Sequence, residues 1–283
     1  MQTVNTLGTL REAVESLRAT GPVALVPTMG ALHQGHLTLV REARARGAQV
    51  VASIFVNPRQ FGPNEDLDAY PRRMAEDSRL LSEEGVAVLW APDVAEMYPQ
   101  GFSTNISVTG VSDNFCGASR PGHFDGVATV VCKLFNQVRP DLALFGEKDW
   151  QQLAVIRRMA RDLDLSYPHV DAIYGVPTVR EADGLAMSSR NQYLSAEERQ
   201  AAATLPAAMR AALASIAGGT PVADALASLR ASLLAAGFSS IDYADLADAA
   251  SLEPIAAPGA VPARLLVAAR LGSTRLIDNM PLG

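Results

Sequence analysis

The sequence is poor in cysteine, histidine and aromatic residues. Its 283 residues include two cysteines, four histidines and only 6% aromatic residues. Two cysteines cannot build a disulfide framework, so we expect Cys116 and Cys132 to be reduced thiols of a cytoplasmic protein. Neither has a nearby histidine that would mark it as a nucleophile.

Long apolar runs and an excess of positive charge are also missing. No apolar run approaches the roughly 20 residues of a membrane-spanning helix. The first residues, MQTVNTLGTLREAVESL, lack the charged start and apolar block of a signal peptide. With 24 Lys and Arg against 30 Asp and Glu, the formal net charge is −6, which argues against a nucleic-acid-binding surface. We therefore expect a cytoplasmic protein with small-molecule ligands and with no nucleic-acid or membrane partner.

Hydrophobic residues, by contrast, make up 48% of the chain and form short apolar runs that alternate with helical patterns. Such alternation predicts a Rossmann-like parallel sheet with helices on both faces. The runs that we expect to be its strands are residues 23–27, 50–56, 87–91 and 142–146, with 104–108 as a further candidate. The helical patterns cover residues 9–19, 36–46, 66–84, 126–138 and 150–163.

The composition changes after about residue 175. Residues 196–236 are rich in alanine and helical in pattern, with a Gly-Gly-Thr-Pro break at 218–221. Residues 241–248 and 264–279 resemble strands. We therefore predict an α/β domain over residues 1–175 and a smaller α+β domain over residues 176–283.

The most informative stretch is VALVPTMGALHQGHLTLV, residues 23–40. An apolar strand, a glycine turn and a helix start together predict a phosphate site, because the first N–H groups of a helix have no partner within it. His33 and His36 lie three residues apart, so both imidazoles would reach one ligand. The alternatives are solvated rings at a capped helix start, or a zinc site. Zinc is disfavoured because the HExxH pattern is absent and no cysteine lies close by.

Two polar loops follow other predicted elements. FVNPRQF carries Asn57 and Gln60, uncharged side chains suited to the hydroxyl or carboxylate groups of a small substrate; an ordinary proline-stabilised turn is the alternative. ASRPGHFDGV places Arg120 and His123 in a turn before a helix. That turn is either a flap over the site or a connector with Asp125 as helix cap.

Two further motifs offer cationic groups. LFGEKDWQQL contains Lys148, a common type of phosphate ligand, in a cluster that would also be normal at a helix start. DGLAMSSRN offers hydroxyls and the guanidinium of Arg190, which suit triphosphate oxygens; a serine helix cap is the alternative. Because ligands of parallel sheets bind at the carboxyl ends of strands, we expect the motifs after strands to share one site.

Taken together, these motifs resemble those of the pantoate–β-alanine ligase family. PTMGALHQGH, SIFVNPRQF, ASRPGHFDGV, LFGEKDWQQL, DGLAMSSRN and RLIDN occur in the order and spacing of that family. HQGH looks like the HIGH-type signature of the nucleotidyltransferase superfamily, and MSSR looks like its KMSKS-type loop. The resemblance spans nearly the whole chain.

The resemblance implies that pantoate and ATP, with Mg²⁺, form pantoyl adenylate and pyrophosphate, and that β-alanine then displaces AMP to give pantothenate. It also implies a cytoplasmic homodimer whose smaller domain closes over the ATP site. Catalytic roles would fall to His36, His33, Lys148 and Arg190, pantoate binding to Gln60 and Gln152, and β-alanine binding to Gln60. The implied ATP-binding residues are Met29, Gly30, Ala31, Leu32, His33, Gln34, Gly35, His36, Gly146, Glu147, Lys148, Asp149, Val176, Met187, Ser188, Ser189 and Arg190.

The magnesium ligands are not implied by any motif; Glu76 and Asp77 are the acidic candidates. Two other functions compete with the ligase. A nucleotidyltransferase that acts on a phosphorylated substrate shares the histidine signature but needs a basic pocket, whereas Gln60 and Gln152 are neutral. A non-catalytic nucleotide-binding module would bind ATP and have no turnover to lose.

Overall fold

A computed structural model of the chain describes residues 1–63 and 65–283. The described chain divides into two compact units. The first, which we call the sheet unit, comprises Met1–Val108, Arg120–Glu147 and Gln152–Pro177. The second, the C-terminal unit, comprises Thr109–Ser119, Lys148–Gln151 and Thr178–Gly283. Two short segments thus belong with the C-terminal unit although they precede residue 176, which the sequence patterns did not indicate.

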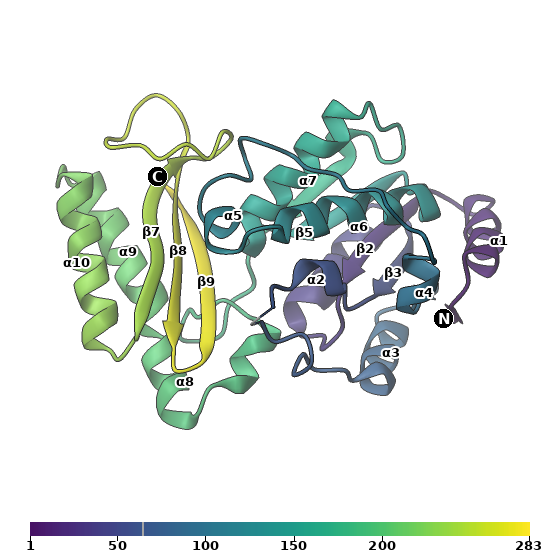
Figure 1. Ribbon diagram of the computed structural model, residues 1–283, viewed down its shortest axis with the longest axis horizontal. Coiled ribbons are helices and arrows are strands. Elements are labelled where there is room, and N and C mark those ends of the chain that lie inside the picture. The colour runs from purple at the N-terminus through teal and green to yellow at the C-terminus, as the bar shows by residue number, and fades with distance from the viewer. Residues whose placement is uncertain (64) are drawn as a thin grey trace. The chain divides into compact units, whose positions relative to one another are not determined.

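The sheet unit contains six parallel strands in the order β1-β4-β3-β2-β5-β6. Three of them, β2, β3 and β5, are labelled in Figure 1. The bounds of the six strands are β1 Gln2–Val4, β2 Val23–Thr28, β3 Gln49–Ile54, β4 Val88–Trp90, β5 Leu142–Gly146 and β6 Ile173–Val176. From β2 the chain proceeds through β3 and β4 on one side and then returns to β5 and β6 on the other, while β1 pairs with β4 at the edge, so the direction reverses between β2 and β5. In such sheets the carboxyl ends at the reversal point are where ligands bind.

Helices cover both faces of this sheet because its strands are apolar on both sides. Ala24 and Val26 of β2 belong to the buried cluster that includes residues of α2 and α3. The alternate residues Val23 and Leu25, also fully buried, fall on the opposite face, where α1 and α6 contact β2 and each other. The predicted Rossmann-like sheet is therefore confirmed. The helices of the unit are α1 Leu7–Arg18, α2 Gln34–Ala45, α3 Met74–Glu83, α4 Val94–Met97, α6 His123–Val138 and α7 Trp150–Asp162. The first residues of α7 belong to the C-terminal unit. The 3-10 turns are η1 Pro58–Gln60, η2 Glu147–Asp149 and η3 Val170–Ala172.

Two sequence predictions for this unit were wrong. The helix expected over residues 66–84 begins only at Met74, after Pro71, since a proline disfavours helical backbone in the residue before it. Residues 104–108 form no strand. There the Ile106 N–H donates to the Thr129 hydroxyl of α6 at 3.0 Å, a side-chain acceptor in place of a neighbouring strand. β1 and β6 were missed because three and four residues are too few to show a period.

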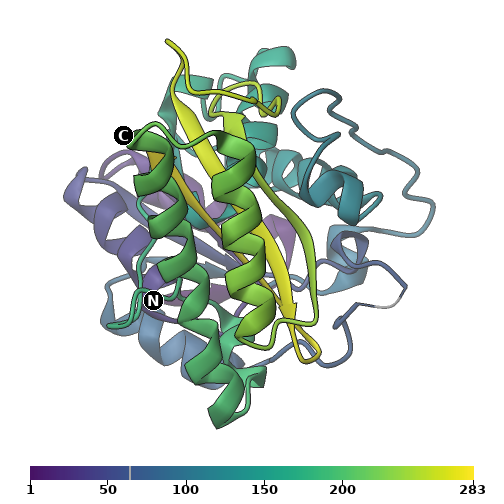
Figure 2. The ribbon, with the colours of Figure 1, turned by 90° about the vertical axis from the view of Figure 1, so that its left-hand side faces the viewer.

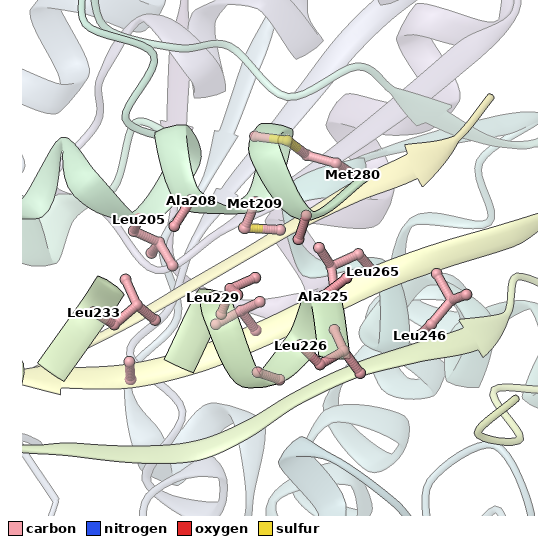
Figure 3. Close-up of a cluster of buried hydrophobic side chains, with 14 of the residues drawn as sticks. Leu205, Ala208, Met209, Ala225, Leu226, Leu229, Leu233, Leu246, Leu265 and Met280 are labelled. Atoms are coloured by element: carbon pink, nitrogen blue, oxygen red, sulfur yellow. The ribbon is translucent and has the colours of Figure 1, made fainter. Parts of the chain in front are cut away.

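The C-terminal unit contains a three-stranded antiparallel sheet in the order β7-β8-β9, formed by Ser240–Asp248, Ala263–Leu271 and Thr274–Leu282. Two helices, α9 (Thr204–Ala217) and α10 (Val222–Ala235), lie side by side against it (Figure 2). Their apolar residues and one face of the sheet form a single core, with Met209, Leu229 and Leu265 at its centre (Figure 3). The other helical elements here are α5 Cys116–Ser119, η4 Ser189–Tyr193 and α8 Ala196–Ala202. The predicted α+β arrangement is confirmed.

Among the residues that the structure describes, no helix combines the length and apolar character needed to cross a lipid bilayer.

Candidate functional site

The loop after β2 carries the first part of the site. Gly30 and Ala31 both have positive φ angles, 87° and 50°, which turn the chain sharply between the strand and α2. The Asp77 carboxylate of α3 holds this turn: Oδ2 accepts the Ala31 N–H at 2.9 Å and Oδ1 accepts the Leu32 N–H at 2.8 Å. Asp77 is 1% exposed, and a Cβ added to Gly30 would lie 3.0 Å from its Oδ2. The turn and the carboxylate are therefore fitted to each other.

His33 and His36 together cap the start of α2. Nδ1 of His33 accepts the Gly35 N–H at 3.1 Å, and Nδ1 of His36 accepts the His33 N–H at 3.3 Å, which forms a reciprocal capping box. The ring centroids are 4.1 Å apart. Because each Nδ1 accepts a hydrogen bond, each neutral ring carries its proton on Nε2. The structure thus brings two imidazole donors together at the N-terminus of a twelve-residue helix, where backbone N–H groups also favour an anion.

Gln60 lies in the turn η1 after β3, the strand beside β2. Asn57, fully buried, donates from Nδ2 to Gln60 Oε1 at 2.9 Å and to the Gly126 carbonyl at 3.1 Å. Asn57 Oδ1 in turn accepts the Tyr98 hydroxyl at 2.9 Å. Burial raises the pKa of Tyr98 to about 12, against the opposing effects of Arg59 and Asn57, so its hydroxyl keeps its proton and stays a donor. This chain of hydrogen bonds fixes the Gln60 amide with its Oε1 occupied, which leaves Nε2 as the donor for a ligand.

Arg120 and His123 hold the same turn from its other end. Arg120 Nη2 and His123 Nδ1 lie 3.1 Å and 2.8 Å from the Gln60 carbonyl oxygen. Arg120 also binds both carboxylate oxygens of Glu65, at 2.7 and 2.5 Å. Burial opposes ionisation of Glu65, but the hydrogen bond and charge of Arg120 outweigh it and lower its pKa to about 2. The Asp125 helix cap considered for this loop is not formed in the described chain: Gly122 is the N-cap of α6 with no side-chain cap hydrogen bond, and Asp125 instead accepts a hydrogen bond from Asn105 Nδ2 at 2.9 Å. Through Arg120 and His123 the loop braces the turn that carries Gln60.

Gly126 lets α6 approach the turn. A Cβ added to it would lie 2.9 Å from the Gln60 nitrogen and closer still to the Arg59 carbonyl oxygen, nearer than any real contact. Only glycine fits at this position without displacing the backbone of η1.

The carboxyl ends of β5 and β6 supply further predicted site residues. Gly146 and Val176 are register partners on these neighbouring strands. Since β3 and β5 flank β2, the turn with Gln60, the histidine loop and Gly146 follow adjacent strands at one sheet edge. Glu147 follows Gly146 directly, and Gln152 lies half-buried in the first turns of α7.

Lys148 and Asp149 belong to the C-terminal unit. Their side chains form an ion pair at 3.8 Å, in which Lys148 is 18% and Asp149 44% exposed. The Lys148 carbonyl accepts a hydrogen bond from Asn279 Nδ2 of β9 at 2.8 Å. The lysine is therefore held through its backbone as well as by the ion pair of its side chain with Asp149.

The segment Met187–Arg190 lies in the same unit and starts η4. Ser188 caps this turn, because its hydroxyl accepts the Arg190 N–H at 3.3 Å. The Met187 N–H donates to the Val179 carbonyl at 3.0 Å, and Asn191 Nδ2 donates to the Ala186 carbonyl at 3.1 Å. Met187, Ser188, Ser189 and Arg190 are all half-buried. The serine cap considered as an alternative thus exists, because Ser188 caps η4.

The acidic candidates for magnesium both have other partners in the structure. Asp77 is buried and accepts two backbone N–H groups with its carboxylate, and Glu76 pairs with Arg79 on the surface of α3. Within residues 1–63 and 65–283, no three side chains of the types that bind metals gather into one group. The described residues therefore offer no ready protein cage for a cation.

Sequence reasoning missed three supporting residues: Asp77 as the anchor of the loop after β2, Tyr98 beside Asn57, and Glu65 beside Arg120. The only signal for Asp77 was an acidic residue in a helix that packs beside the loop. Tyr98 lies 41 residues from its partner and Glu65 lies 55 residues from its partner, so no local pattern could link them.

Comparison with known proteins identifies the family of the chain. A family model described as Pantoate-beta-alanine ligase matches residues 2–281. The pantothenate synthetase of Novosphingobium aromaticivorans is 72% identical over 284 residues, covering 100% of this chain and 99% of the relative. The crystal structure of pantothenate synthetase from Thermus thermophilus is 49% identical with a TM-score of 0.93, covering 100% of this chain and 99% of that one. The pantoate-beta-alanine ligase of Francisella tularensis, complexed with beta-gamma ATP and beta-alanine, is 30% identical with a TM-score of 0.83, covering 99% and 97%.

Proposed function

The chain belongs to the pantoate–β-alanine ligase family, a family of enzymes. We propose that it joins pantoate to β-alanine through pantoyl adenylate, with release of AMP and pyrophosphate. One observation carries the proposal. Two imidazole Nε2 donors at the N-terminus of α2 and the oriented amide of Gln60 follow neighbouring strands of one sheet edge. The first group suits phosphates and the second suits a small hydroxy acid.

ATP is the nucleotide of this proposal, as in the Francisella tularensis complex. In the sheet unit its ligands are Met29–His36, Gly146, Glu147 and Val176, where glycine and positive-φ backbone allow close approach. In the C-terminal unit they are Lys148, Asp149 and Met187–Arg190.

In the first step a pantoate carboxylate oxygen attacks the α-phosphorus of ATP. The new O–P bond forms as the bond from the α-phosphorus to the bridging oxygen breaks, and that oxygen leaves with pyrophosphate. Negative charge grows on the phosphate oxygens, and preorganised donors that meet it lower the barrier. His36 is the principal donor in this role, with His33, Lys148 and Arg190 as its partners.

In the second step the β-alanine amine attacks the acyl carbon of the adenylate. The C–N bond forms, the C–O bond to AMP breaks, and the amine loses a proton. AMP is a good leaving group, so no enzyme nucleophile is required, which agrees with the absence of a Ser-His-Asp or Cys-His motif in the sequence. Catalysis then depends on positioning and charge stabilisation.

Gln60 and Gln152 bind pantoate in this proposal, and Gln60 also contacts β-alanine. Their amides are neutral and suit hydroxyl and carboxylate groups. A phosphorylated second substrate would need cationic partners at these positions, so the geometry favours pantoate over that alternative. Mg²⁺, when bound, would screen the charge of the ATP phosphates and would be held mostly by those phosphates and by water.

The direct test is an ATP-dependent coupling assay with pantoate and β-alanine, each omitted in turn. We expect pantothenate and AMP only when all three substrates are present, and exchange of pyrophosphate into ATP that requires pantoate but not β-alanine. Formation of ADP, or exchange that proceeds without pantoate, would contradict the proposed intermediate. ATP binding without turnover under all conditions would indicate the non-catalytic module instead.

A further inference from the structure

Two adjacent polar residues, Asp278 and Asn279, are buried in the middle of β9. They are 2% and 5% exposed. Because side chains alternate along a strand, Asp278 shares the face of Leu276 and Met280. Both of these residues belong to the apolar core that includes residues of α9 and α10, in which Met280 is labelled in Figure 3. Asn279 lies on the opposite face. Burying a carboxylate on the core side of a sheet destabilises the fold unless the charge is paired, so the partner of Asp278 needs to be identified.

On the core side, Asp278 holds Arg180. Arg180 Nη1 donates to Oδ2 at 2.7 Å and Nη2 donates to Oδ1 at 2.9 Å, a two-pronged ion pair. Nη1 also donates to the Gly184 carbonyl at 3.0 Å. Arg180 lies in a small hairpin. Its backbone forms an antiparallel β-bridge with Ala186, and the Met187 N–H donates to the Val179 carbonyl. The hairpin ends at Met187, so Asp278 holds the chain that leads directly into Ser188, Ser189 and Arg190.

On the other side of the strand, Asn279 holds Lys148. Its Nδ2 donates to the Lys148 carbonyl at 2.8 Å. The same short segment is attached twice more to this unit: Trp150 Nε1 donates to the Ala249 carbonyl at 2.9 Å, and the Arg264 guanidinium stacks 3.6 Å from the Trp150 ring centroid. Asp278 Oδ1 also accepts the Asn279 N–H at 2.7 Å, which ties the two polar residues to each other.

We propose that Asp278 and Asn279 are positioning residues that set Lys148 and Met187–Arg190 in register for one nucleotide. Neither touches ATP in this proposal. Both cationic segments lie far apart in sequence, and both are attached within one unit to consecutive residues of one strand. The inference rests on the proposed function, which assigns those two segments to ATP. It gives a purpose to the RLIDN motif, for which the sequence alone indicated only a resemblance.

Equilibrium binding of ATP in the absence of pantoate tests the Asn279 arm without turnover. We expect Asn279→Ala to raise the Kd for ATP about fivefold to tenfold, the scale of one lost hydrogen bond. The matched control is Thr274→Val on the same strand, where a buried hydroxyl without a hydrogen-bond partner in the described chain is replaced by a methyl group. Thr274→Val should leave the Kd unchanged.

A double-variant cycle separates positioning from general loss of structure. If Asn279 acts through Lys148, adding Asn279→Ala to Lys148→Ala should cause no further rise in the Kd. An equal fold-loss in both backgrounds, or wild-type binding by Asn279→Ala beside weakened binding by Lys148→Ala, overturns the positioning proposal alone. Wild-type ATP binding by Lys148→Ala itself overturns the site assignment of the proposed function, and the positioning proposal with it.

The Asp278 arm is tested in the same way against Arg190. Asp278→Asn keeps the volume and removes the charge, and we expect a higher Kd for ATP whose rise disappears in an Arg190→Ala background. If Asp278→Asn does not fold, Arg180→Lys serves instead, because it keeps the ion pair and loses the second prong and the link to Gly184. An unchanged Kd in the folded variant overturns this arm.

Discussion

At the scale of single residues, the site depends on groups whose second hydrogen bond fixes the first. His33 and His36 each use Nδ1 to cap α2, and this use determines that Nε2 is the donor. Gln60 has its Oε1 held by Asn57, which determines that its Nε2 is the donor. Binding a ligand then loses little side-chain entropy, because these side chains are already ordered in the folded protein.

Replacement of His36 by alanine tests the principal phosphate donor. We expect His36→Ala to lower the rate of pantoate-dependent pyrophosphate exchange at least ~100-fold, the scale of losing one preorganised donor. Lys148→Ala should have a comparable effect. The control is His169→Ala, just before η3, where the side chain is 64% exposed and lies on the amino-end side of β6 rather than at the carboxyl ends of the strands; this variant should exchange at the wild-type rate. Wild-type exchange by either site variant would remove that residue from the mechanism.

Asp77 should matter to catalysis although it contacts no substrate. Asp77→Asn keeps the shape but turns one of two acceptors into a donor that faces a backbone N–H, so the turn at Gly30 and Ala31 loses its anchor. We expect a rise of about tenfold or more in the KM for ATP, since a buried N–H without a partner costs roughly 1–3 kcal/mol. Glu76→Gln, one residue away and exposed, is the control. Equal kinetics for the two variants would refute the anchoring role.

Gln60 provides a test of substrate assignment. Gln60→Ala should raise the KM for pantoate more than the KM for ATP, because the amide is proposed to bind the hydroxy acid and not the nucleotide. Steady-state kinetics with each substrate varied in turn measure both constants. An unchanged KM for pantoate would contradict the role given to this residue.

At the scale of elements, the strand order decides which loops meet. β3, β2 and β5 are neighbours, so the loops after them share one edge, although β3 ends at Ile54 and β5 begins only at Leu142. The turn after β3 is then braced by α6 through Gly126 and by the Arg120–Glu65 pair. Removing a contact of this brace should both displace Gln60 and lower the free energy of unfolding.

The brace gives a signed dependence of stability on pH. The pKa of Glu65 is about 2 in the folded protein and 4.5 ordinarily, so the folded state binds fewer protons between these values. The stabilisation is therefore complete above pH 4.5 and is lost as the pH falls towards 2. After allowance for solvent screening, we expect Glu65→Gln to lower the free energy of unfolding by about 1 kcal/mol at pH 7.

Urea unfolding of wild type and Glu65→Gln at several pH values measures this effect. The difference between them should be largest near neutrality and shrink below pH 4.5. Glu83→Gln is the control, since Glu83 pairs with Arg79 on the surface of α3 with 58% exposure, where ion pairs contribute little. A gap between wild type and Glu65→Gln that stays constant down to about pH 3 would contradict the assignment.

At the scale of the whole molecule, the resemblance to the family predicts a homodimer. Light scattering coupled to size-exclusion chromatography should then give about twice the 29.9 kDa mass of one chain. A concentration series from micromolar downward would show whether the assembly holds at low concentration. A particle with the mass of a single chain throughout would contradict the prediction. The cytoplasmic location also stays a prediction.

Several features of this protein were predictable from its sequence because they depend on local pattern. The alternation of apolar runs and helices was sufficient for the Rossmann-like sheet, and the spacing of His33 and His36 was sufficient to expect both rings at the start of one helix, where His33 proves to be the N-cap and His36 the third helical residue. Five motifs in order, with RLIDN also fitting, were sufficient for the family. In each of these cases the signal lies within a few residues, or repeats with the period of a helix or strand.

Only the tertiary structure decided which distant groups support the site. Asp77 is an ordinary acidic residue in a helix pattern until folding buries it against Ala31, 46 residues away. Asp278 is a charge within a strand until Arg180, 98 residues away, pairs with it. Residues 104–108 look like a strand until Thr129 takes the N–H of Ile106. Sequence periodicity reports which face of an element is apolar, but the partner of a buried polar group is chosen by the packing of the whole chain.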